Sequence, residues 1–158
     1  MSEFSDVPDV EAVTRVVLRM LIAALLGGLL GLQRESHGKE AGVRTHMLVA
    51  LGSALFVLVP LQAGSDPDDL SRVIQGVIAG VGFLCAGTIL KVSGPGEDQV
   101  RGLTTAAGIW LTAAIGIAVG LGREMTAVVS TLLALGILAL EGPIRRRFGK
   151  TETRAPDS

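Results

Sequence analysis

The strongest constraint on this chain is a series of apolar segments that are each long enough to cross a lipid bilayer. Residues 45–65, for example, include no Asp, Glu, Lys or Arg. A bilayer core about 30 Å thick is crossed by roughly 20 helical residues, because lipid offers no hydrogen-bond partners to backbone groups. A hydrophobic content of 49% and a mean hydropathy of +0.54 agree with lipid as the solvent. The sequence therefore predicts an all-α membrane protein.

Five segments approach the length needed for a span, and they lie at residues 14–32, 45–65, 73–90, 102–122 and 125–140. The last is the shortest and needs flanking residues or a locally thinner bilayer to cross. We expect one transmembrane domain over residues 14–141, an acidic external tail at 1–13 and a basic cytoplasmic tail at 142–158. The first tail lacks the basic region of a secretory signal, so the first apolar segment is expected to stay as an anchor.

Basic residues are concentrated in alternate loops and near the C-terminus. One side of the membrane would hold Arg34, Lys39, Arg44, Lys91, Arg101 and the basic residues between 145 and 154. The opposite loops hold only Arg72 and Arg123. Because Lys and Arg in short loops are retained in the cytoplasm, the N-terminus is predicted outside and the C-terminus inside. The expected location is the bacterial inner (plasma) membrane, as a multi-pass protein.

Glycine recurs at four-residue intervals inside three of the predicted helices. In lipid, small residues on one helix face allow two backbones to approach closely. We therefore expect the first, third and fourth helices to pack tightly together, and a homodimer interface is a further interpretation of such pairs. The glycines assigned to helix packing are Gly27, Gly31, Gly76, Gly80, Gly82, Gly87, Gly116 and Gly120.

Two loops on the predicted cytoplasmic side are rich in charge. The first runs directly into the second helix, where polar groups at the membrane boundary need partners. The second contains a Gly-Pro-Gly turn at residues 94–96. If the loops meet, their arginines can pair with their carboxylates, although a solvated turn is the alternative interpretation. The predicted polar cluster comprises Arg34, Glu35, Arg44, Thr45, His46, Glu97, Asp98 and Arg101.

Other polar residues suggest weaker hypotheses. Thr104, Thr105 and Trp110 fall within the fourth predicted helix, so we expect them to be buried polar groups with partners in the protein. Asp66, Asp68 and Asp69 crowd one short loop, and carboxylate oxygens suit Mg²⁺ or Ca²⁺. Their spacing matches no complete metal loop, so an ordinary acidic turn is the preferred interpretation.

Several classes of function are disfavoured. A net charge of −1 does not suggest a nucleic-acid binder, and the single cysteine, Cys85, excludes an intramolecular disulfide. No nucleophile and base pair or phosphate-binding glycine loop is recognisable. We therefore expect neither an enzyme nor a bound cofactor.

Three sequence blocks resemble the membrane domain of the MgtC/SapB family. Residues 42–49 (GVRTHMLV) follow residues 31–35 (GLQRE), and they are similar to the family pattern G-(L/V)-R-T-(H/N)-x-L-V. Residues 80–89 (GVGFLCAGTI) and 100–110 (VRGLTTAAGIW) resemble two further family blocks in the same order. Together they cover about residues 27–122. A set of ordered blocks is far more specific than one short pattern.

The resemblance implies a five-helix inner-membrane protein connected with magnesium limitation, acid stress and virulence. Family members of the best-known type bind other membrane proteins, including ATP synthase. Gln33 stands where a glutamate is common, Cys85 replaces a usual glycine, and the cytoplasmic C-terminal domain of many members is not expected here. We expect a small regulatory protein that binds other membrane proteins. An oligomeric ion or small-solute transporter or channel is the alternative, and a structural scaffold is a third interpretation.

The predicted topology can be tested with single cysteines at Ser36, Ser65 and Ser158 in a Cys85→Ser background. An impermeant thiol reagent added to intact cells is expected to label only the Ser65 position, because the other two are assigned to the cytoplasm. Labelling at Ser158 would show that the orientation is reversed.

Overall fold

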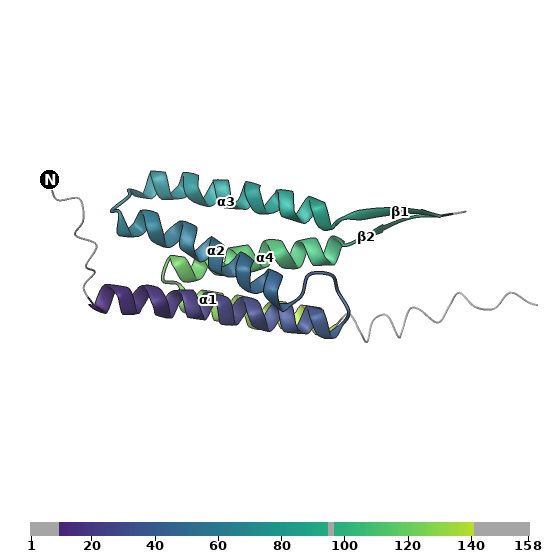
Figure 1. The fold of residues 1–158 in the computed structure, drawn as a ribbon, viewed down its shortest axis with the longest axis horizontal. Coiled ribbons are helices and arrows are strands. Elements are labelled where there is room, and N and C mark those ends of the chain that lie inside the picture. The colour runs from purple at the N-terminus through teal and green to yellow at the C-terminus, as the bar shows by residue number, and fades with distance from the viewer. Residues whose placement is uncertain (1–9, 95–96, 141–158) are drawn as a thin grey trace, which may run out of the picture.

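The computed structural model describes residues 10–94 and 97–140, except for the side chains of residues 90–99. Within these ranges five helices follow one another, with a β-hairpin between the third and fourth (Figure 1). The elements are α1 (Val10–Ser36), α2 (Val43–Gln62), α3 (Pro67–Thr88), β1 (Leu90–Gly94), β2 (Glu97–Arg101), α4 (Leu103–Gly120) and α5 (Glu124–Ala139). The first four helices are long and apolar enough to span a membrane, and α5 is shorter, with 16 residues. The predicted all-α membrane protein with five helices is confirmed.

Two helices, α1 and α3, begin about one turn or more before their apolar segments do. The start of α1 at Val10 adds a polar turn in which Arg15 pairs with Glu11 at 2.7 Å. The start of α3 is set by Asp66, whose Oδ1 accepts the backbone N–H groups of Asp68 and Asp69 at 3.0 and 2.9 Å. Such a cap satisfies N–H groups that the helix leaves without partners, and hydropathy does not detect it.

The loop predicted around residues 94–96 is the turn of an antiparallel ribbon. Leu90 pairs with Arg101 at its base and Gly94 with Glu97 at its tip. The ribbon projects beyond the ends of the helices (Figure 1). Gly102 then adopts φ 91°, in the left-handed region that favours glycine, and a Cβ there would overlap the carbonyl of Thr88. The sequence analysis expected a loop here and did not predict the two strands.

The glycine faces of α1 and α4 both lie against the backbone of α2. A Cβ on Gly27 would approach the carbonyl oxygen of His46 to 2.6 Å, and one on Gly120 would approach that of Ala54 to 2.8 Å. Gly31 and Gly116 meet α2 in the same way. Since any side chain at these positions would push the helices apart, glycine is what allows this approach.

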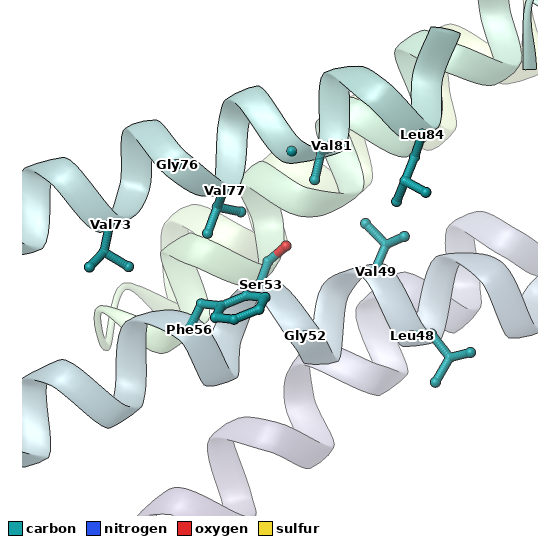
Figure 2. A pocket seen from close by; sticks show the side chains of 11 residues that line it. Leu48, Val49, Gly52, Ser53, Phe56, Val73, Gly76, Val77, Val81 and Leu84 are labelled. Atoms are coloured by element: carbon teal, nitrogen blue, oxygen red, sulfur yellow. The ribbon is translucent and has the colours of Figure 1, made fainter. Parts of the chain in front are cut away.

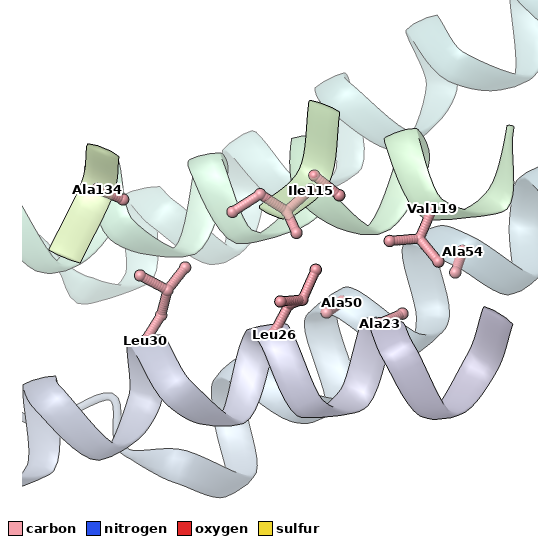
Figure 3. Packing of buried hydrophobic residues seen from close by; sticks show 9 residues of the cluster. Ala23, Leu26, Leu30, Ala50, Ala54, Ile115, Val119 and Ala134 are labelled. Carbon is pink, nitrogen blue, oxygen red and sulfur yellow. The ribbon is translucent and has the colours of Figure 1, made fainter. Parts of the chain in front are cut away.

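Around this contact the core is built mainly from small and branched apolar residues. Figure 3 shows them converging from α1, α2, α4 and α5. The cluster consists of Ala23, Leu26, Leu30, Ala50, Ala54, Ile115, Val119, Ala127 and Ala134. At the end of the bundle nearer the N-terminus, Arg19 pairs with Glu124 at 3.2 Å and joins α1 to α5.

The third helix is the exception to close packing. In the most apolar 18-residue segment of α3, only 11% is buried inside the protein. In the corresponding segment of α4 the buried share is 56%. Nothing lies within 4 Å of a Cβ built on its glycines, Gly76, Gly80, Gly82 and Gly87. The expectation that these glycines pack α3 against the other helices is therefore wrong within one chain. Instead α3 meets α4 along another face, where the Cys85 thiol donates to the Ala106 carbonyl at 3.2 Å.

Alanine substitutions should separate the two kinds of glycine. Gly116→Ala is expected to lower the free energy of unfolding by about 1–3 kcal/mol, because its Cβ meets the Ala50 carbonyl. Gly80→Ala and Gly136→Ala fill open space, so they should leave it unchanged or raise it by up to about 1 kcal/mol through helix propensity. Thermal unfolding in detergent measures all three. Equal destabilisation by Gly80→Ala and Gly116→Ala would contradict this packing.

Candidate functional site

The alternating direction of the helices gathers most of the predicted cluster at one end of the bundle. The end of α1, the start of α2, the hairpin and the start of α4 meet there, as Figure 1 shows. We call this the hairpin end. It carries Arg34, Glu35, Arg44, Thr45, His46 and Arg101, whereas Asp66, Asp68 and Asp69 belong to the opposite end. Which end faces the cytoplasm stays a prediction.

Two residues of the cluster are buried beneath the loop that joins α1 and α2. Arg34 and His46 are each 1% exposed, and Arg34 is the largest fully buried side chain of the described residues. The Arg34 carbonyl accepts the N–H groups of His37 and Lys39 at 3.2 and 3.1 Å, which closes the end of α1. A buried guanidinium in a membrane protein is costly and must be stabilised by its surroundings.

One ring nitrogen of His46 has a hydrogen-bond partner, and the other has none among the described residues. Nδ1 lies 3.0 Å from the Gly42 carbonyl, and because a carbonyl only accepts, Nδ1 carries the proton. Nε2 is buried and finds no hydrogen-bond partner among the described residues. It lines a cavity of about 150 Å³ together with residues of α1, α4 and α5, including Leu30, Thr104 and Leu138.

Glu35 has a structural partner in the backbone of α2. Its Oε2 accepts the N–H of Val43 at 2.9 Å, at the start of a helix that has no side-chain cap from Gly42. A Cβ on Gly42 would overlap that same carboxylate oxygen. Glu35 therefore caps the N-terminus of α2, although it lies eight residues before Val43 in the sequence.

Arg44 does not form the ion pair with Glu35 that the sequence suggested. Arg44, Thr45 and Arg101 are exposed, and Glu35 serves Val43 rather than Arg44. The side chains of Glu97 and Asp98 lie outside the described residues. The cluster thus divides into two buried residues, Arg34 and His46, and an exposed part that includes Glu35, Arg44, Thr45 and Arg101. Sequence reasoning could not separate them, because burial depends on which side of α1 and α2 faces the bundle.

The expectation of buried polar groups in α4 is correct for Thr105 but wrong for two of its neighbours. Thr105 is 6% exposed, whereas Trp110 is 49% exposed and Thr104 is exposed as well. The buried stripe of α4 passes through Ile109 and Ala113, and Trp110 points away from it.

Two further threonines, Thr112 and Thr131, are fully buried. Thr112 and Thr131 satisfy their hydroxyl groups within their own helices, by donating to the carbonyls of Gly108 and Ala127, each at 2.8 Å. No sequence signal distinguishes such a residue, because the partner is always present one turn earlier.

The acidic residues of the α2–α3 loop are used for helix capping. Asp66 caps α3, and Asp69 pairs with Arg72 at 2.9 Å. Within the described ranges no group of three or more His, Cys, Asp or Glu residues is placed so that it could hold a metal ion.

A lateral groove between α2 and α3 is a further feature that sequence reasoning missed. It has a volume of about 580 Å³, and Figure 2 shows valines of α3 and Phe56 of α2 around it. Ser53 is the one polar side chain in its lining. The groove exists because α3 contacts α4 more closely than it contacts α2. We refer to it as the α2–α3 groove.

Comparisons with known proteins agree with the membrane architecture. The sequence profile described as MgtC family matches residues 20–147. The chain is 49% identical over 133 residues to Protein SrpB of Synechococcus elongatus, covering 78% of this chain and 72% of that protein. It is 39% identical over 129 residues to the putative magnesium transporter YhiD of Escherichia coli K12, covering 77% and 58%. No solved structure matches.

A third relative shows how far the similarity extends. The chain is 40% identical over 119 residues to Protein MgtC of Salmonella typhimurium, covering 75% of this chain and 49% of that protein. The chain therefore spans about half the length of this relative, and its similarity to each of the three is confined to the shared part.

Arg34 and Arg44 lie at the same end of the bundle, but their different burial predicts different losses of stability when each is replaced. Arg34→Met should lower the free energy of unfolding by about 3 kcal/mol, because the buried guanidinium is not without a partner and methionine cannot replace its charge. Arg44→Met, at an exposed position, should change the thermal midpoint little. Equal midpoints for the two variants in detergent would mean that Arg34 is not held in the interior.

Proposed function

Because this chain belongs to the MgtC family, we propose that it is a small regulatory membrane protein that binds another membrane protein, in a role linked to magnesium limitation or acid stress. The sequence resemblance supports the physiological link. The E. coli relative is named a putative magnesium transporter, and that name supports magnesium as the relevant ion.

The observation that carries the binding proposal is the contrast between glycines. The glycine pairs of α1 and α4 all touch the backbone of α2, whereas Gly76, Gly80 and Gly87 of α3 meet nothing within 4 Å. At about 100° per residue these three fall on one side of α3, which we call the glycine face. Phe83, 82% exposed, lies on the same side.

Glycine in a helix interior costs about 1 kcal/mol relative to alanine. A row of glycines facing lipid would gain nothing in return, but the same row allows a second helix to approach closely. The glycine face therefore suits an apolar transmembrane helix of a partner protein. This reasoning supports docking through α3 and leaves the core of α1, α2 and α4 as its rigid support.

The alternative is an oligomeric ion or solute transporter, which the name of the E. coli relative favours. Magnesium flux into proteoliposomes distinguishes the two. Flux well above that of protein-free vesicles would favour transport, and flux at the background level together with partner capture would favour regulation.

Leucine substitutions on two sides of α3 test the binding proposal. Gly80→Leu should weaken partner capture from native membranes by about 5- to 100-fold, which corresponds to about 1–3 kcal/mol of overpacking. Gly82→Leu is the matched control, since it also fills open space but lies about 200° around the helix. A photoreactive residue at Phe83 identifies the captured protein.

Growth in low magnesium provides the physiological measurement for the same pair. Gly80→Leu is expected to impair growth at wild-type protein levels, and Gly82→Leu is not. Identical capture and growth for both variants would remove the case for the glycine face.

A further inference from the structure

The α2–α3 groove ends close to an exposed arginine. Arg44 lies one helical turn before Leu48, which lines the groove at the hairpin end. The Arg44 side chain is exposed and makes no hydrogen bond or ion pair with the described residues. A second exposed arginine, Arg101, lies at the base of the hairpin. It pairs with Leu90, which follows shortly after the end of α3. The mouth of an apolar groove is thus next to basic residues.

The length of the groove matches one leaflet of a bilayer. It follows α2 from Leu48 to Phe56 and α3 from Val73 to Leu84, which is about 12–16 Å at 1.5 Å per residue. A leaflet contributes about half of a hydrocarbon core that is about 30 Å thick. The groove runs along the helices, the direction in which acyl chains extend.

The lining of the groove suits an acyl chain. Ten of the eleven lining residues are apolar or glycine, and Ser53 is the one polar side chain among them. The glycine face borders the groove through Gly76 and Gly80.

We propose that the α2–α3 groove and Arg44 form a binding site for an anionic phospholipid. The acyl chain lies between the groove residues, and the Arg44 guanidinium binds the phosphate, for which its planar fork of donors is suited. The predicted topology places this end in the cytoplasm, where the leaflet is anionic and basic pockets between helices bind lipid headgroups. The site does not depend on the proposed function, because it requires no protein partner.

Lipid binding can be measured on the full-length protein after delipidation in detergent. Phosphatidylglycerol and phosphatidylcholine with the same acyl chains are added, and thermal stability and bound lipid by native mass spectrometry are recorded. Phosphatidylglycerol should bind at least tenfold more tightly, and Arg44→Gln should abolish this preference. Arg72→Gln, which removes an exposed arginine at the opposite end, should retain it. Equal binding of the two lipids, or equal losses in both variants, would overturn the headgroup assignment.

The groove itself is tested by filling it. Gly52 lines the groove and a Cβ there meets nothing within 4 Å, so Gly52→Leu should occupy the space and reduce binding of both lipids at least tenfold. Gly136→Leu in α5 is the matched control. A phosphatidylglycerol with a photoreactive acyl chain, added to the unmodified protein, should label α2 and α3. Labelling confined to other helices, or a changed oligomeric mass instead of lost lipid in Gly52→Leu, would overturn the proposal.

Discussion

The structure depends on the close approach of α1 and α4 to the backbone of α2. In lipid there is little hydrophobic driving force between helices, so van der Waals contact between well-fitted surfaces must hold the bundle together. Glycine provides that fit at Gly27, Gly31, Gly116 and Gly120. A Cβ at any of these positions would meet backbone atoms of α2 or of Gly42, the residue just before α2. The alanine-rich core and the Arg19–Glu124 ion pair then position α5 against the same framework.

This framework also explains the character of the hairpin end. Because α1 and α2 cross closely at Gly31, the loop between them is pulled over the bundle, and Arg34 and His46 are enclosed beneath it. Glu35 then lies close enough to Val43 to cap α2. The next residue of α2, Arg44, faces outward. One helix crossing thus separates the buried structural part of the polar cluster from the exposed part that is available to ligands.

The position of α3 gives the protein its two open surfaces. Since α3 rests on α4 through the side that includes Val81 and Cys85, its glycine face is left uncovered and a groove forms toward α2. The two surfaces adjoin each other, because Gly76 and Gly80 belong to the glycine face and also line the groove.

The sequence by itself determined the membrane class, the five helices and the family, because apolar length and ordered motifs are local properties of the chain. It also indicated the charged loops and the small-residue faces. Only the tertiary structure decided that the glycines of α1 and α4 meet α2 while those of α3 do not, since four-residue spacing defines a helix face but not its neighbour. The same holds for Arg34 and Arg44, which look alike in sequence. Their burial differs because helix rotation about the α1–α2 crossing turns one inward and the other outward.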